Sequence, residues 1–71
     1  GLVQAKFDIV GFQVKLPTGA SLSVKGDHFD DKTLAAIKKL KQGNTINLMY
    51  IKAKGPDGKE IQLRGLPIEL N

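Results

Sequence analysis

The sequence predicts a small α+β domain in which one helix packs on an antiparallel sheet, with the element order strand, strand, helix, strand, strand. Two observations predict this class. Apolar and polar residues alternate with a period of two in several segments, which is typical of half-buried strands. Residues 30–43 alone combine a helix start, an apolar stripe and a terminal glycine. A bulged, immunoglobulin-like sandwich with an inserted helix is the alternative that remains open.

The N-terminal residues are expected to form one long strand that contains a bulge, or two strands bent at Gly11. Apolar side chains occupy the odd positions of residues 3–9 and the even positions of residues 10–16, so the phase slips near Gly11. One extra residue in a β-bulge restores the apolar face, and glycine is common at such sites. A proline–glycine turn at residues 17–19 then leads into a second, antiparallel strand over residues 20–25.

The helix is expected to begin at Asp30, whose carboxylate can accept hydrogen bonds from the first free N–H groups. Gly43 is expected to end it in the left-handed conformation. Phe29 precedes the cap and can pack back on the first turns. The predicted core-facing stripe consists of Leu34, Ile37 and Leu40. The side chains expected in solvent are Lys32, Ala35, Lys38 and Lys39.

The C-terminal half predicts a third strand over residues 45–53. Its apolar phase changes near residues 48–51, which indicates either a bulge or burial on both faces there. Residues 54–59 form a strong hairpin turn, because Pro, Asp and Gly follow one another as a type I turn with a glycine bulge prefers. A fourth strand begins near Ile61, is interrupted at Gly65 and resumes on the opposite parity. Pro67 lacks a backbone donor, so this last segment is expected at an edge or a bulge.

The composition favours one domain, residues 1–71, stabilised by packing alone. The 71 residues include no cysteine and one histidine, so neither disulfides nor a zinc site is expected to staple the fold. The formal charge of +4 and the pI of about 9.6 are compatible with an acidic protein, nucleic acid or an anionic membrane surface as partner. No apolar run is long enough to cross a bilayer.

No segment predicts catalysis, a metal site or a cofactor. Residues 27–31 are the only cluster of acidic residues and histidine with metal-ligand chemistry, but helix capping accounts for the aspartates. Ser21 or Ser23 with His28 and an aspartate does not make a hydrolase, because a triad also needs a pocket and an oxyanion hole. The sequence therefore predicts a protein that is not an enzyme.

Lysines gather on the helix and near the second hairpin. A basic face built on Lys32, Lys38 and Lys39 makes a small nucleic-acid-binding module the alternative function, although a nucleic-acid footprint usually adds a motif or stacking aromatics. The three phenylalanines lie on apolar phases and are expected in the core, which leaves Tyr50 as the aromatic residue free to stack. The candidate partner-binding residues are Lys38, Lys39, Lys41 and Tyr50.

Four segments, in this order, resemble the C-terminal periplasmic domain of the GldM/PorM proteins of Bacteroidetes gliding motility and type IX secretion. They are the first strand at residues 7–14, the glycine-polar-apolar approach at residues 23–29, the lysine-rich helix at residues 30–43 and the Ile-x-Ala-x-Gly-Pro-Asp-Gly hairpin at residues 51–59, with Leu-Pro-Ile at residues 66–68 after it. The resemblance spans nearly all of the chain.

This resemblance implies a structural, protein-interaction role in the periplasm, without enzymatic activity. It also implies attachment to a membrane-anchored or exported protein, partners in the cell envelope and, in many members, a homodimer. Nucleic acid is not an expected partner on this view. An open sheet edge that accepts a strand from another chain is the expected mode of assembly, together with an apolar contact.

Overall fold

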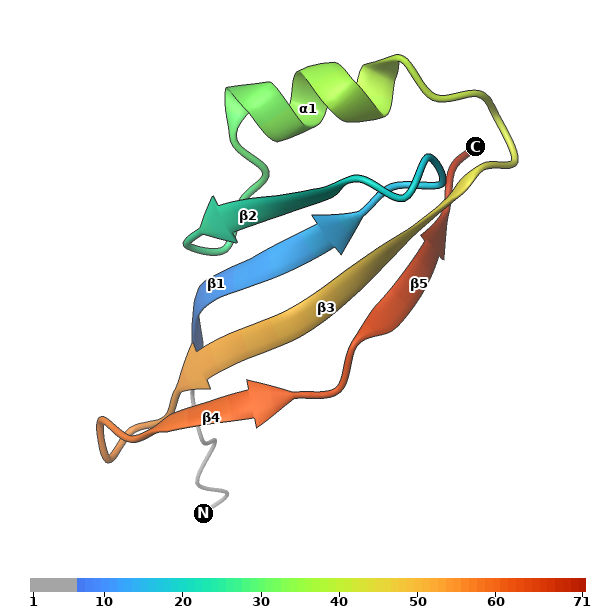
Figure 1. Cartoon of the computed structure of the whole chain (residues 1–71). Coiled ribbons are helices and arrows are strands. Elements are labelled where there is room, and N and C mark those ends of the chain that lie inside the picture. Colours follow the sequence, from blue (N-terminus) through green and yellow to red (C-terminus); the bar gives the residue numbers. More distant parts are fainter. Residues whose placement is uncertain (1–6) are drawn as a thin grey trace.

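The computed structural model describes residues 7–71, which form one antiparallel sheet with a short helix on one face (Figure 1). Its elements are β1 (Asp8–Lys15), β2 (Ser21–Lys25), α1 (Asp31–Lys38), β3 (Thr45–Lys54), β4 (Glu60–Leu63) and β5 (Leu66–Glu69). The strand order is β2-β1-β3-β4, and β5 also pairs with β3. The α+β class is therefore confirmed. The described residues contain a single sheet, so the immunoglobulin-like sandwich gains no support.

The N-terminal hairpin forms as expected. β1 and β2 are antiparallel, with Val14 opposite Leu22, and Gly19 takes a positive φ of 93° in the connecting turn. The N–H of Leu16 donates to the carbonyl of Ala20 at 2.8 Å and closes the hairpin. Of the long first strand predicted from residue 3 onward, the part before residue 7 lies outside the described residues.

Both predicted phase slips correspond to bulges between β1 and β3. Ile9 lies opposite Ala53 and Gly11 opposite Lys52, so β1 has one extra residue there. Between Gly11 and residue 13 the extra residue is on β3 instead, at Tyr50, which has a φ of 51°. Because each strand gains one residue, the two bulges compensate, and the apolar face of the sheet continues across them.

The last strand is divided in two, as the change of parity at Gly65 predicted. β4 and β5 both pair with β3, and residues 64–65 join them along the same edge. A Cβ on Gly65 would lie 2.5 Å from the carbonyl oxygen of Leu48, so only glycine fits against the central strand there. Pro67 lies opposite Asn47 on the outer strand, and its predicted edge position is confirmed.

The helix is shorter than predicted. The Asp30 carboxylate accepts a hydrogen bond from the N–H of Thr33 at 2.8 Å, which confirms the N-cap. The helix ends at Lys38, however, with Lys39 as its C-cap, and does not continue to Gly43. Gly43 has the expected positive φ of 90°, but its N–H donates to the carbonyl of Leu70 at 2.8 Å. Residues 41–44 are thus held by the end of the chain after β5 and do not extend the helix.

The core lies between α1 and the β2-β1-β3 part of the sheet. Its buried residues are Val14, Leu16, Val24 and Ile46. Ala36, Ile37 and Leu40 pack against them, whereas Leu34 is 38% exposed. The predicted stripe is therefore wrong at Leu34. The eight-residue helix turns Ala36 toward the core, and it also buries Thr33, which is 1% exposed.

Candidate interaction surface

One face of the sheet is apolar from β2 to the β4–β5 edge. Residues directly opposite each other on neighbouring strands share a face. Val14 lies opposite both Leu22 and Leu48, and Leu48 lies opposite Leu66. Beyond the bulges, Ile51 lies opposite Leu63. These pairs form a continuous apolar surface that is wider and longer than the helix above it.

The helix covers only part of this surface. Eight helical residues span about 12 Å, at roughly 1.5 Å per residue, whereas the ten residues of β3 extend over about 33 Å, at roughly 3.3 Å per residue. The helix lies beside β2 and leaves the β4–β5 side without cover (Figure 1). Ile61, Leu63 and Leu66 are accordingly 41%, 37% and 45% exposed.

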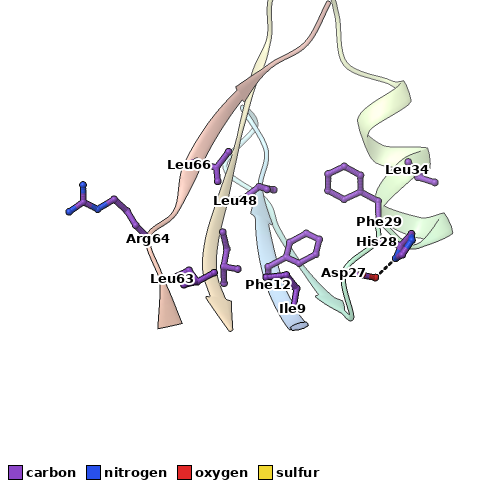
Figure 2. Close-up of a pocket in the computed structure, with 11 residues that line it drawn as sticks. Ile9, Phe12, Asp27, His28, Phe29, Leu34, Leu48, Leu63, Arg64 and Leu66 are labelled. Atoms are coloured by element: carbon purple, nitrogen blue, oxygen red, sulfur yellow. Dashed lines mark hydrogen bonds and ion pairs between the residues drawn. The ribbon is translucent and has the colours of Figure 1, made fainter. Parts of the chain in front are cut away.

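The uncovered region forms an apolar groove of about 620 Å³. Its floor is the sheet, and one wall is formed by Phe29 and Leu34 from the helix side (Figure 2). Phe12 and Phe29 pack edge to face with their ring centroids 5.8 Å apart, so this end of the groove is built of aromatic surface. The remaining apolar lining comes from Ile9, Leu48, Ile51, Leu63 and Leu66. We refer to this surface as the apolar groove.

Among the described residues that line the groove, the polar and ionisable side chains stand at its ends. Asp27 and His28, a hydrogen-bonded pair, lie at the helix side, and Arg64 extends outward at the β4–β5 side (Figure 2). Small-molecule sites usually place several polar groups so that they converge on the ligand. In this groove the polar groups diverge, which favours contact with another apolar surface.

Asp30 follows Asp27 and His28 in the chain, but it is the N-cap of α1 and does not line the groove. Hydrogen bonding from the Thr33 side chain, and then from the Thr33 backbone, lowers the pKa of the Asp30 carboxyl below its ordinary value, and nearby Lys32 adds to the effect. The carboxylate therefore stays ionised and satisfies the first turn of the helix.

The predicted partner-binding residues lie in two separate places. Lys38 ends α1, Lys39 is its C-cap and Lys41 follows in the loop, and all three are exposed. Tyr50 is 52% exposed and lines a shallow hollow with Gly11, Gln13, Ser23 and Lys52. None of the three helix-end lysines lines that hollow, so the structure does not assemble the four residues into one site.

Two expectations for the aromatic residues have different outcomes. Phe12 and Phe29 are half-buried and pack against the core, as predicted. Phe7 is 48% exposed, so its expected core position is wrong. Phe7 precedes β1 and approaches Gly55, in the turn after β3, where no helix covers the sheet.

Among residues 7–71 no group of three or more His, Cys, Asp or Glu side chains is placed to hold a metal ion. No helix in that part of the chain has the length and hydropathy needed to span a bilayer.

Comparison with known families gives a match over nearly the whole chain. The family described as "GldM C-terminal domain" matches residues 2–71, essentially the whole chain. The chain belongs to the GldM C-terminal domain family. No curated protein matches the sequence. Members of the GldM family are envelope-associated, and their domains are structural components of gliding-motility and type IX secretion machinery.

The sequence reasoning missed the groove because it assigned the apolar positions to a common core. A usable signal was present. Residues 61–70 contribute five large apolar side chains to the sheet, namely Ile61, Leu63, Leu66, Ile68 and Leu70. Residues 7–71 contain only one helix to cover them, and that helix also has to cover β1 and β2.

Proposed function

We propose that this GldM-type domain is a non-enzymatic structural and protein-interaction module of the bacterial periplasm. In this proposal it is part of a membrane-anchored or exported protein of the gliding-motility and type IX secretion apparatus. It assembles through apolar contacts and a sheet edge. The observation that carries the proposal is the apolar groove, because soluble proteins seldom leave a continuous apolar surface of this kind without a partner.

A second copy of the domain is the occupant that the groove fits best. A twofold-symmetric interface brings the same surface of two copies together. Arg64 and Asp27 lie at opposite ends of the groove. A twofold axis that lies in the interface, at right angles to the line from Arg64 to Asp27, directs Arg64 of each copy toward Asp27 of the other. The apolar floor would then be covered by its own counterpart, and both charges would acquire partners at the rim, where solvent keeps such pairs weak but selective.

Light scattering of the 71-residue chain at tens of micromolar tests this proposal. We expect a mass near twice 7.7 kDa. Leu66→Lys places a charge on the groove floor and is expected to give a monomer, because the buried ammonium would have no partner. Gln62→Glu is the control on the other face of β4. It also introduces a charge, but the new carboxylate lies opposite Lys52, a residue of opposite charge, and the variant should leave the dimer intact.

A wild-type chain that remains monomeric up to millimolar concentration would overturn the homodimer. Dimers of equal stability in both variants would show that association does not use the groove. Circular dichroism of each variant confirms that the fold is retained, which separates loss of association from loss of structure.

A further inference from the structure

The sheet has two outer edges, and their backbone groups differ. β2 forms one edge of the strand order, and β4 with β5 forms the other (Figure 1). In an antiparallel pair, hydrogen-bonded and non-hydrogen-bonded residue pairs alternate, so every second residue of an edge strand directs its N–H and C=O outward. The backbone hydrogen bonds at the ends of each strand pair fix which residues those are.

On β2 the outward residues are the odd-numbered ones. The N–H of Leu16 donates to Ala20 and the N–H of Gly26 donates to Val10, so the pairs of even-numbered residues are the hydrogen-bonded ones. The outward N–H and C=O groups consequently belong to Ser21, Ser23 and Lys25. All three residues are exposed. β2 therefore presents three regularly spaced donor and acceptor sets on an unbroken strand.

The β4–β5 edge lacks this regularity. The N–H of Gly55 donates to Lys59, which places the outward groups of β4 on Glu60 and residue 62. The N–H of Leu70 donates to Asn44, which places those of β5 on residues 67 and 69. The outward residues thus change from even to odd across Gly65, and Pro67 has no N–H to offer. A straight partner strand cannot pair with both halves of this edge.

The side chains at β2 define the chemistry of the incoming strand. On one face, Leu22 and Val24 belong to the apolar core layer. On the other face, Lys25 ends β2 and Lys15 lies opposite Ser21, so a basic residue stands at each end of the β1–β2 pair. Neither β2 nor residues 11–15 of β1 contains an acidic residue. An added strand with apolar side chains on one face and carboxylates on the other satisfies both faces.

We infer that the β2 edge binds an extended segment of a partner protein in which apolar and acidic residues alternate. The segment adds as a further strand beside Ser21, Ser23 and Lys25. This inference rests on the proposed function of the domain as an interaction module, but it uses a different surface from the apolar groove. The groove accommodates the second copy, and the β2 edge receives the partner.

The test is a titration of the full chain, labelled with ¹⁵N, with a short blocked peptide of alternating glutamate and valine. We expect amide hydrogen exchange to slow at Ser21, Ser23 and Lys25 and to stay unchanged at Glu60 and Gln62. A peptide of alternating lysine and valine should bind at least about tenfold more weakly, because it meets Lys15 and Lys25 with like charge.

Two proline variants give a matched comparison. Ser23→Pro removes the central outward N–H without removing a hydrogen bond to β1, and it should weaken binding at least about tenfold. Gln62→Pro makes the same change on the β4 edge and should leave the affinity unchanged. If Ser23→Pro fails to fold, Lys25→Glu replaces it, and this variant should shift the preference toward the lysine–valine peptide.

Three results would overturn the inference. They are absence of peptide binding at millimolar concentration, protection at the β4–β5 edge, and β2 amides already protected by self-association without peptide. Repeating the titration on the monomeric Leu66→Lys variant separates the two proposals. Peptide binding there supports the β2 edge even if the groove does not form the dimer.

Discussion

Gly65→Ala is the substitution that tests most sharply how β4 and β5 are joined. A Cβ at this position would lie 2.5 Å from the carbonyl oxygen of Leu48, well inside the 3.0 Å below which the surrounding atoms have to move. The carbonyl belongs to β3, the strand that pairs with β1 as well as with β4 and β5. Because β3 is held on both sides, the strain is relieved by displacing the β4–β5 junction.

Steric insertion into a packed site typically costs about 1–3 kcal/mol. Average stability is about 0.05–0.15 kcal/mol per residue, which for 71 residues gives roughly 4–11 kcal/mol. A loss of about 2 kcal/mol is therefore a large share of the total, and it corresponds to a fall in Tm of roughly 8–16 °C for a domain of this size.

Urea unfolding followed by circular dichroism measures this loss. Arg64→Ala, at the neighbouring exposed position, is the control and should change the free energy of unfolding by less than about 0.5 kcal/mol. If Gly65→Ala unfolds at the same urea concentration as the wild type, the close approach to Leu48 does not constrain the junction, and the steric reasoning is refuted.

Three further predictions concern the helix and the bulge. In urea unfolding, Ile37→Lys should destabilise the fold by at least about 2 kcal/mol, because Ile37 packs on the core. Leu34→Lys should cost less than about 0.5 kcal/mol, because Leu34 is exposed. Equal losses of stability in the two variants would contradict the observed helix orientation. Folding lowers the pKa of Asp30, so its contribution to the free energy of unfolding is present above the ordinary carboxyl pKa and is lost as the pH falls through the folded value. In urea titrations at a series of pH values, Asp30→Asn should therefore lose less stability toward acid than the wild type does. An unchanged pH dependence in this variant would rule out the cap as the source of the acid sensitivity. Tyr50→Gly should leave the stability in thermal unfolding unchanged or raise it by up to about 1 kcal/mol, because glycine adopts a φ of 51° without strain. The control Lys52→Gly should lower the stability by about 1 kcal/mol. An equal loss of stability in the two variants would count against strain in the bulge.

Local signals predicted the elements of this fold well. The phase changes near Gly11 and Tyr50 are properties of the period-two pattern, and each marks a bulge in the structure. The parity change at Gly65 likewise marks the division between β4 and β5. The Asp30 cap could be predicted because it joins a side-chain oxygen to an N–H only three residues later, which is a purely local arrangement.

Tertiary features were less predictable. The helix ends at Lys38 and not at Gly43, and the Gly43 N–H pairs instead with Leu70, a partner that is distant in the sequence. The exposure of Leu34 depends on how the helix rotates over the sheet, which helical spacing alone does not determine. The groove results from a mismatch between the length of the helix and that of the sheet. The candidate residues Lys38, Lys39, Lys41 and Tyr50 came from charge and composition, which do not say which surfaces meet.

The central claim is that the apolar groove is covered by a second copy of the domain. The most direct measurement is methyl NMR of the chain with a soluble paramagnetic agent, recorded from micromolar to millimolar concentration. The groove methyls of Leu48, Leu63 and Leu66 are predicted to become shielded from the agent as the concentration rises, while the buried methyls of Val14 stay shielded throughout. Leucine methyls in the groove that remain equally accessible at every concentration would contradict the account.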